Sequence, residues 1–419
     1  AASDVYKRQE KGGKLNISDS VGTGVVDNTS HGKGAIVNSG EVTLNGGTFK
    51  RSVEKGTYSP YSGNGNSWYT IANYGTMEIN TGVTVKNAGG YSSMIRNGSD
   101  RVTANCYLTI KGGNFTGGVN TVKNDSFGVL TINGGNFSNT AQYVIMNWNK
   151  AEITAGTFQT LDTASAVLFT SAYGGDANTI GKLSISGGEF KHASDTQEMI
   201  VDHYDASNSG TAAVTGGKFD ADISKYISTD YVQSADGTVE KLGETNAVAK
   251  VGGTYYKTLA DAVAAAQDGD TITLLKDAEL TSTLNLTKNI TIDGQGKYTI
   301  KAANSFTVGS DNKTYCVLYV SGEVTLKDVT VNGNEKCRVI FCDKGKLTID
   351  GATITNGKAP NFIGGVYMTS SASFEMKSGS ITGNKNAKGY QNDEYLQYSS
   401  DLWIGANALS LIHISEPTR

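Results

Sequence analysis

The sequence predicts an all-β protein made of two tandem right-handed parallel β-helical solenoids, with a short capping helix at the start of the second. A hydrophobic pair followed by Gly-Gly-x-Phe recurs along the chain, as in Leu108-Thr-Ile110-Lys-Gly112-Gly113-Asn-Phe115. The pair has the alternate-residue period of a strand with one buried face. The closest copies are 21 and 22 residues apart, which suits one turn of such a coil.

The repeat defines the inside of the first solenoid. The second apolar residue of each copy is Ile17, Leu44, Ile79, Ile110, Ile132, Ile153, Ile185 or Val214. A phenylalanine follows five residues later in most copies, at Phe49, Phe115, Phe137, Phe158, Phe190 and Phe219. The Gly-Gly pair permits a sharp bend, because glycine adopts positive φ without a side-chain penalty. Stacking the turns about 4.8 Å apart then predicts an internal column of phenylalanine rings.

A second solenoid follows a cap near residues 220–245. We expect a helix over 255–267, with Thr258 as N-cap and Asp261 three residues later. Three further turns share the same internal offsets, at Val324/Leu326/Val331, Leu347/Ile349/Ile354 and Phe374/Met376/Ile381. A preceding strand is expected to add Leu318, Phe341 and Met368 to another inward column. The predicted domains are 10–245 and 246–408.

The two ends of the chain are related through the genetic code. Codons that encode Asp4-Val-Tyr-Lys-Arg-Gln9 encode Leu409-Ser-Leu-Ile-His-Ile414 on the complementary strand. Residues 1–9 and 409–419 therefore resemble a translated sequencing-library adaptor, and we expect them to lie outside the native fold. The native piece is expected to be an internal fragment of a longer protein.

Composition excludes several classes of function. The net charge is −4 with no basic stripe, which argues against nucleic-acid binding. No apolar run approaches the roughly 18 residues of a membrane helix. The four cysteines Cys106, Cys316, Cys337 and Cys342 have no metal-ligand spacing, and no cofactor or metal is expected. We expect free thiols, with a bridge from Cys316 to Cys337 or Cys342 as the alternative in an exported protein.

Several motifs resemble a known superfamily. Residues 347–357, Leu-Thr-Ile-Asp-Gly-Ala-Thr-Ile-Thr-Asn-Gly, together with Gly364-Gly-Val-Tyr-Met and the Gly-Gly-x-Phe turns, resemble right-handed parallel β-helix proteins of the pectin-lyase-like superfamily. More narrowly, they resemble adhesin-like surface proteins of gut bacteria. The resemblance implies an extracellular or cell-surface location. Its motifs specify the fold more than the function, because the repeated residues face the core.

Enzymatic signatures of that superfamily are incomplete. Met199-Ile-Val-Asp-His-Tyr-Asp resembles the Trp-Ile-Asp-His strand of pectate lyases, in which an Asp holds calcium. The Arg-x-Pro-x-x-Arg stretch that carries their basic residue is absent, and so are the carboxylate motifs of polygalacturonases. Asp202 and His203 are therefore interpreted as a surface pair, and Gly174-Gly-Asp176 as a plain turn. No catalytic residue is assigned.

The longest insertion of the first coil is the candidate binding site. Residues 55–74 carry Tyr58, Tyr61, Trp68 and Tyr69 among Gly, Ser and Asn. Aromatic faces with hydroxyl and amide neighbours suit sugar rings, although the rings could instead anchor the loop on the coil. A second aromatic group, Tyr390, Tyr395, Tyr398 and Trp403, is harder to interpret.

The sequence thus favours a non-catalytic extracellular structural or adhesin-like solenoid. Its partner is expected to be a glycan or another ligand on a host or cell surface, bound through loop aromatics. Two alternatives remain at this stage: a polysaccharide lyase or glycoside hydrolase of the β-helix fold, and a segment of a phage tail spike.

Overall fold

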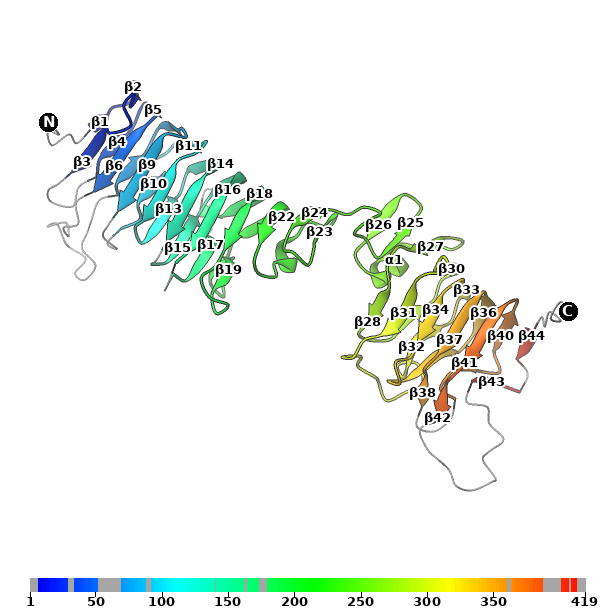
Figure 1. Ribbon diagram of the computed structural model, residues 1–419. Helices are drawn as coiled ribbons and strands as arrows, with labels where there is room; N and C mark the ends of the chain where they lie inside the picture. Colours follow the sequence, from blue (N-terminus) through cyan, green and yellow to red (C-terminus); the bar gives the residue numbers. More distant parts are fainter. Residues whose placement is uncertain are drawn as a thin grey trace. The chain divides into compact units, whose positions relative to one another are not determined.

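A computed structural model describes residues 7–28, 34–51, 69–87, 92–139, 141–161, 164–172, 179–359, 363–386, 401–406 and 408–412. The chain divides into two compact units, residues 1–241 and 242–419. In each unit, successive strands stack side by side as the rungs of a parallel β-solenoid (Figure 1). The predicted all-β class with tandem β-helical coils is confirmed.

The first unit has two long parallel sheets. Sheet 1A consists of β1 (Lys7–Gln9), β4 (Ile36–Asn38), β7 (Ile71–Asn73), β10 (Ile95–Asn97), β13 (Asn120–Asn124), β15 (Tyr143–Asn147), β17 (Ala166–Thr170) and β19 (Glu198–Val201). Sheet 1B consists of β2 (Lys14–Ile17), β3 (Val25–Asn28), β5 (Glu41–Leu44), β6 (Gly47–Arg51), β8 (Thr76–Ile79), β9 (Val83–Asn87), β11 (Cys106–Ile110), β12 (Asn114–Gly117), β14 (Gly128–Asn139), β16 (Lys150–Thr160), β18 (Lys182–Lys191) and β22 (Thr211–Phe219).

The predicted phenylalanine column lies inside sheet 1B. The five rings from Phe115 to Phe219 stack nearly parallel, with successive centroids 4.6, 4.9, 4.8 and 4.5 Å apart. Val85 fills the column position between Phe49 and Phe115. Only the second glycine of each pair is needed for the bend before the ring. Gly135, a second glycine, has φ +109°, a conformation that favours glycine. The first glycine can be replaced, since Ala155 occupies that position in another turn.

A buried asparagine ladder runs along sheet 1A, and the sequence analysis did not detect it. Each amide Nδ2 donates to the Oδ1 of the next rung at 2.7–2.8 Å. The ladder ends with a 3.1 Å bond to the Thr170 hydroxyl. Its members, all fully buried, are Asn38, Asn73, Asn97, Asn124 and Asn147. An amide suits this place because it donates to one neighbour and accepts from the other.

Short elements close the first unit. The hairpin β20 (His203–Asp205) with β21 (Asn208–Ser209) projects after β19. A 3-10 helix, η2 (Ser224–Tyr226), and the antiparallel pair β23 (Tyr231–Gln233) and β24 (Val239–Lys241) then follow β22. Ile223 and Val239 from this region join the core, so the cap covers the last rung.

The second unit has three parallel sheets. Sheet 2A consists of β29 (Leu284–Leu286), β32 (Cys316–Val320), β35 (Arg338–Cys342), β39 (Val366–Met368) and β43 (Leu402–Ile404). Sheet 2B consists of β25 (Ala249–Val251), β26 (Thr254–Tyr256), β27 (Thr271–Leu274), β30 (Ile290–Asp293), β33 (Glu323–Lys327), β36 (Gly345–Asp350), β40 (Ala372–Met376) and β44 (Leu409–Ile412). Sheet 2C consists of β28 (Ala278–Leu280), β31 (Thr299–Ala302), β34 (Thr330–Asn332), β37 (Ala352–Thr355) and β41 (Gly379–Thr382). A small pair, β38 (Lys358–Ala359) and β42 (Lys385–Asn386), lies outside them.

The predicted capping helix is present but shorter than expected. Helix α1 covers Leu259–Ala265, and the Thr258 side chain accepts a hydrogen bond from the Asp261 backbone N–H at 3.1 Å. Residues 254–256 form β26 instead, in an antiparallel hairpin with β25 that pairs with β27. The hairpin and helix therefore cover the first rung, and Lys288 caps the helix by donating to the carbonyls of Val263, Ala264 and Ala266.

One predicted inward column is wrong. The three turns at Val324, Leu347 and Phe374 are in register as expected. In sheet 2A, however, Leu318 pairs with Ile340, which pairs with Val366, and Met368 pairs with Cys342, whereas Phe341 pairs with Tyr319 and Tyr367. Phe341 therefore belongs to the outer face. The sequence of β35, Arg-Val-Ile-Phe-Cys, does not alternate between polar and apolar residues, so it does not show which side chains point inward. In the structure all five residues are buried.

The inner ends of both adaptor-like segments are paired with the coils. Lys7–Gln9 pairs with β4, and Leu409–Ile412 pairs with β40. Leu409 and Leu411 are 74% and 52% exposed, so they add little to the core. These contacts use backbone hydrogen bonds, which any extended segment can supply at a sheet edge. The adaptor origin of the segments stays a prediction.

All four cysteines are buried free thiols. Burial raises the pKa of Cys316, Cys337 and Cys342 to about 12, and it also raises the pKa of Cys106. The thiolate is the reactive form, so these groups are inert in the folded protein.

We expect Phe137→Ala to lower the free energy of unfolding of the first unit by about 3–5 kcal/mol, because it leaves a cavity between two stacked rings. Chemical denaturation of the full chain measures this. Thr131→Ala, on the outer face of the same strand, is the control and should change it by less than about 0.5 kcal/mol. Equal effects of the two changes would show that the column does not hold the turns together.

We also expect iodoacetamide at pH 8 to label no cysteine in the native chain and all four after denaturation, as counted by mass spectrometry. Burial and the raised pKa values protect the thiols in the folded state. Only two labels in the denatured, unreduced chain would instead show a disulfide.

Candidate functional site

The predicted aromatic site is only partly within the described structure. Tyr58, Tyr61 and Trp68 lie outside the described residues, whereas Tyr69 immediately precedes the rung of β7 and is half-buried. The Arg96 guanidinium lies over the Tyr69 ring, 5.3 Å from its centroid. One face of this ring is therefore occupied by protein, and Tyr69 fixes the end of the insertion on sheet 1A.

Arg96 belongs to a network of paired charges on the outer face of sheet 1A. Its Nε donates to Asp125 Oδ2 at 2.9 Å, and its Nη2 lies 2.7 Å from the same oxygen. Lys123 Nζ lies 3.1 Å from that oxygen as well. The side chains of Arg96 and Asp125 are only 16% and 12% exposed. Asp125 therefore neutralises two cations in a largely dry place.

The two cations control the ionisation of Asp125. Burial by itself would raise the pKa of this carboxyl, but the charges of Lys123 and Arg96 outweigh burial and hold the pKa below its ordinary value of 3.8. Burial by itself would lower the pKa of Arg96. The neighbouring Tyr69, Asp125 and Tyr74 outweigh burial and raise the pKa above its ordinary value. The network therefore holds Arg96 against the Tyr69 ring, and the charges of Arg96, Lys123 and Asp125 are paired with one another.

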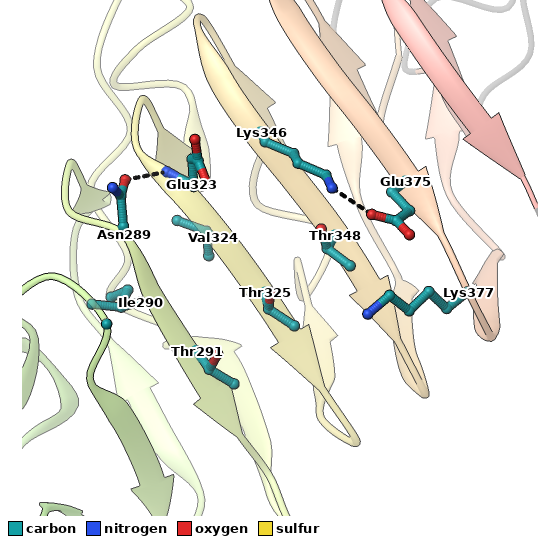
Figure 2. Close-up of a pocket in the computed structure, with 11 residues that line it drawn as sticks. Asn289, Ile290, Thr291, Glu323, Val324, Thr325, Lys346, Thr348, Glu375 and Lys377 are labelled. Atoms are coloured by element: carbon teal, nitrogen blue, oxygen red, sulfur yellow. Dashed lines mark hydrogen bonds and ion pairs between the residues drawn. The ribbon is translucent and has the colours of Figure 1, made fainter.

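A shallow pocket of about 280 Å³ lies on the outer face of sheet 2B (Figure 2). Its lining comes from four neighbouring rungs and the loop before them. The lining residues are Gly269, Asn289, Ile290, Thr291, Glu323, Val324, Thr325, Lys346, Thr348, Glu375 and Lys377. Hydroxyl, amide and charged groups thus dominate the pocket.

The charges in this pocket are largely paired. Lys346 Nζ lies 2.5 Å from Glu375 Oε2, and the Glu375 side chain is 17% exposed. Lys377 lies 3.9 Å from Asp350, and the side chain of Asn289 accepts a hydrogen bond from the Glu323 backbone N–H at 2.9 Å. Such a surface can exchange hydrogen bonds with a hydroxyl-rich ligand.

The two glutamates of the pocket lie on strands that are two rungs apart. Glu323 is in register with Lys346, and Lys346 is in register with Ser373, two residues before Glu375. Two rungs and two residues along the strand separate the backbones of the two glutamates by roughly 12 Å. Lys346 lies on the rung between them, and its ion pair holds the Glu375 carboxylate.

Asp202 and His203 form an ion-pair group at the end of β19. Asp202 Oδ1 lies 3.0 Å from His203 Nδ1, and Oδ2 lies 2.7 Å from Lys225 Nζ. Burial would raise the pKa of Asp202, but the hydrogen bonds from Lys225 and His203 hold it below its ordinary value. The group ties β19 to the cap at η2. Among the residues that the structure describes, no cluster of His, Cys, Asp and Glu could hold a metal ion.

Aromatic rings form a ladder on the outer face of sheet 2A. The rings occupy one column on successive rungs, with centroids 6.2, 5.5 and 6.5 Å apart and planes within 25°. They are Tyr319, Phe341, Tyr367 and Trp403. Phe341 is 4% exposed, and the other three are half-buried. The sequence alone does not indicate this ladder, because its pattern predicts that Phe341 points inward.

The first unit has two aromatic rings on the equivalent strands, Tyr143 in β15 and Phe169 in β17, and further rings from adjoining segments pack against them. In both units these strands precede the strand that carries the inward aliphatic pair. The Tyr143 ring packs 4.7 Å from Phe169, Trp148 packs 5.0 Å from Phe169, and Tyr204 packs 5.9 Å from Trp148. Tyr204 is 67% exposed, so this group reaches solvent. Tyr69 enters the same sheet at β7.

Comparisons with known proteins add little. No family model matches the chain, and no curated protein matches it. Among solved structures, a variant of AlyGC, a PL6 family alginate lyase, overlaps 93% of this chain and 87% of its own, at 11% identity and a TM-score of 0.21. This structural similarity is too low to indicate an activity for this chain. The described residues contain no helix long and apolar enough to cross a membrane.

We expect Asp125→Asn to lower the free energy of unfolding of the first unit by about 3 kcal/mol at pH 7, because Arg96 and Lys123 lose their counter-charge. The native pKa of Asp125 is lowered, so its contribution is present above pH 4–5 and is lost as pH falls through the native pKa. The difference between variant and wild type should therefore shrink in acid. Denaturation curves between pH 7 and pH 2 measure it.

Asp100→Asn is the control, because this carboxylate is 71% exposed and lies 3.5 Å from Arg96. An exposed pair should change stability by less than about 1 kcal/mol. A loss at Asp125→Asn that is the same at every pH would contradict the electrostatic interpretation.

Proposed function

We propose that the chain is a non-catalytic, extracellular, adhesin-like solenoid that binds glycans on the outer faces of sheets 1A and 2A. The observation that carries the proposal is the presence of aromatic groups on equivalent outer faces in both units. In sheet 2A, one outward column has an aromatic ring on four successive rungs.

Folding of the coil does not require rings at these positions. The cores of both units are complete without them, since neither core cluster contains Tyr143, Tyr319, Tyr367 or Trp403. Half-exposed aromatic groups on a surface are typical of binding sites, because they combine apolar area with polar edges. Tyrosine and tryptophan edges with neighbouring hydroxyls suit a sugar chain.

The aromatic residues of the insertion are part of the proposal for the first unit. We include Tyr58, Tyr61, Trp68 and Tyr69 as ligand-binding residues, with Tyr69 as the anchored member. What supports this is that Arg96 and Asp125 hold Tyr69 at the same sheet that carries Tyr143 and Phe169. A glycan of a host or other cell surface is the proposed partner.

A polysaccharide-cleaving activity is the competing proposal, and its geometry is less favourable. A paired-carboxylate mechanism needs two available carboxylates, whereas Glu375 in the sheet 2B pocket is held by Lys346, 2.5 Å away. A binding role does not need a second available carboxylate, so we favour it.

The test is a glycan array with the full chain and two double variants, Tyr367→Ala with Trp403→Ala and Trp68→Ala with Tyr69→Ala. We expect wild type to bind a defined set of glycans and at least one double variant to bind about tenfold more weakly, equivalent to about 1.4 kcal/mol. Tyr107→Ala is the control, because Tyr107 is a 48% exposed ring on the outer face of sheet 1B, outside both groups.

Two results would overturn the proposal. In one, wild type binds no glycan, or both double variants bind as well as Tyr107→Ala. In the other, bound polysaccharides are shortened, as measured by new reducing ends or unsaturated products, which would show an enzyme.

A further inference from the structure

Arg338 is a buried cation without a carboxylate partner among the described residues. Arg338 is the first residue of β35 and is 3% exposed. Nε donates to the Ile363 carbonyl at 2.9 Å, and Nη1 donates to Asn312 Oδ1 at 3.3 Å. Both acceptors are neutral. Burial lowers the pKa of Arg338, and no aspartate or glutamate is among the groups that counter it.

The second terminal nitrogen of this guanidinium is open. Nη2 has no acceptor among the residues that the structure describes. A buried positive charge with unused donors is costly unless an anion completes it.

The guanidinium is held in place by the aromatic ladder of sheet 2A. Its Cζ lies 4.9 Å from the centroid of Tyr367 and 5.6 Å from that of Phe341. These contacts fix the plane of the fork before any ligand arrives, which reduces the entropy cost of binding.

The neighbouring charges do not neutralise Arg338. Asp343 accepts a hydrogen bond from Tyr319 at 3.0 Å and pairs with Lys313 at 3.2 Å. Asp311 accepts hydrogen bonds from the backbone N–H groups of Lys313 and Thr314. Arg96 in the first unit makes the contrast clear, because its carboxylate partner Asp125 lies 2.7 Å away.

We propose that Arg338 anchors a binding site for an oxyanion, the carboxylate or sulfate group of an acidic glycan. The Nη2 group, which has no acceptor among the described residues, can donate a charge-assisted hydrogen bond to an oxygen of such a group. The Tyr319, Tyr367 and Trp403 rings beside it would contact the sugar that carries the anion. This inference rests on the proposed glycan binding and adds a ligand class and an anchoring residue.

The test measures affinities of the full chain for three probes: hyaluronan oligosaccharides, which carry carboxylates, dextran sulfate, which carries sulfates, and neutral dextran. We expect at least one acidic probe to bind more tightly than dextran, with an affinity that falls as salt increases. Arg338→Met should weaken that binding at least tenfold. Arg338→Lys, which keeps the charge but loses the fork, should weaken it less.

Lys327→Met is the matched control, since it removes a cation of the same unit that lies on sheet 2B, away from the aromatic ladder, and already has a carboxylate partner, Asp293, 2.9 Å away. It should change acidic-probe binding by less than about threefold. Thermal unfolding of each variant shows whether the second unit remains folded, and Arg338→Lys keeps the test informative if Arg338→Met does not fold. The acidic probe that responds identifies the oxyanion as carboxylate or sulfate.

Failure of this inference differs from failure of the proposed function. If glycans bind on the array but folded Arg338 variants bind acidic probes as well as wild type does, only the oxyanion site is wrong. The same holds if wild type does not prefer either acidic probe. If no glycan binds to wild type on the array, the proposed function fails and this inference fails with it.

Discussion

In-register stacking of one turn on the next is the constraint on which the whole structure depends. Each strand hydrogen-bonds to strands of the same class in the turns before and after it, so a position in the repeat becomes a column in space. The phenylalanine rings of sheet 1B, the asparagine amides of sheet 1A and the aromatic ladder of sheet 2A are three such columns. The phenylalanine and asparagine columns are buried inside the coil, whereas the aromatic ladder lies on the outer face and is partly exposed to water.

The inward columns of sheets 1B and 2B could be predicted because their residues repeat with a constant period and spacing along the sequence. Leu108, Ile110 and Phe115 repeat with constant offsets from turn to turn, so their stacking follows from the pattern alone. The asparagine ladder was missed because its spacing from these residues varies. Asn73 stands four residues before Met77, whereas Asn97 stands eleven residues before Leu108. Loops at that corner differ in length and conceal the column.

The candidate sites were less predictable, because they depend on contacts between distant turns. Arg96 and Asp125 are 29 residues apart and meet only when two rungs are stacked. Phe341 looked like a core residue, since hydrophobicity does not distinguish an inward ring from one packed in an outer ladder. Arg338 has an ordinary sequence context, and only the packed structure shows that its charge is buried with no carboxylate partner in the part of the chain that the structure describes. The aromatic insertion remained recognisable because it exceeds the length of a minimal turn.

The asparagine ladder also has an evolutionary consequence. Each asparagine amide accepts a hydrogen bond from the preceding rung and donates one to the next. Any rung that has this asparagine can therefore stack above or below any other rung that has it. Duplication of a single turn in the gene would insert a new rung without leaving an unsatisfied polar group inside. The length of the coil can therefore change by whole turns while its cross-section stays the same. Natural selection could adjust how far such a molecule extends independently of the surface it presents.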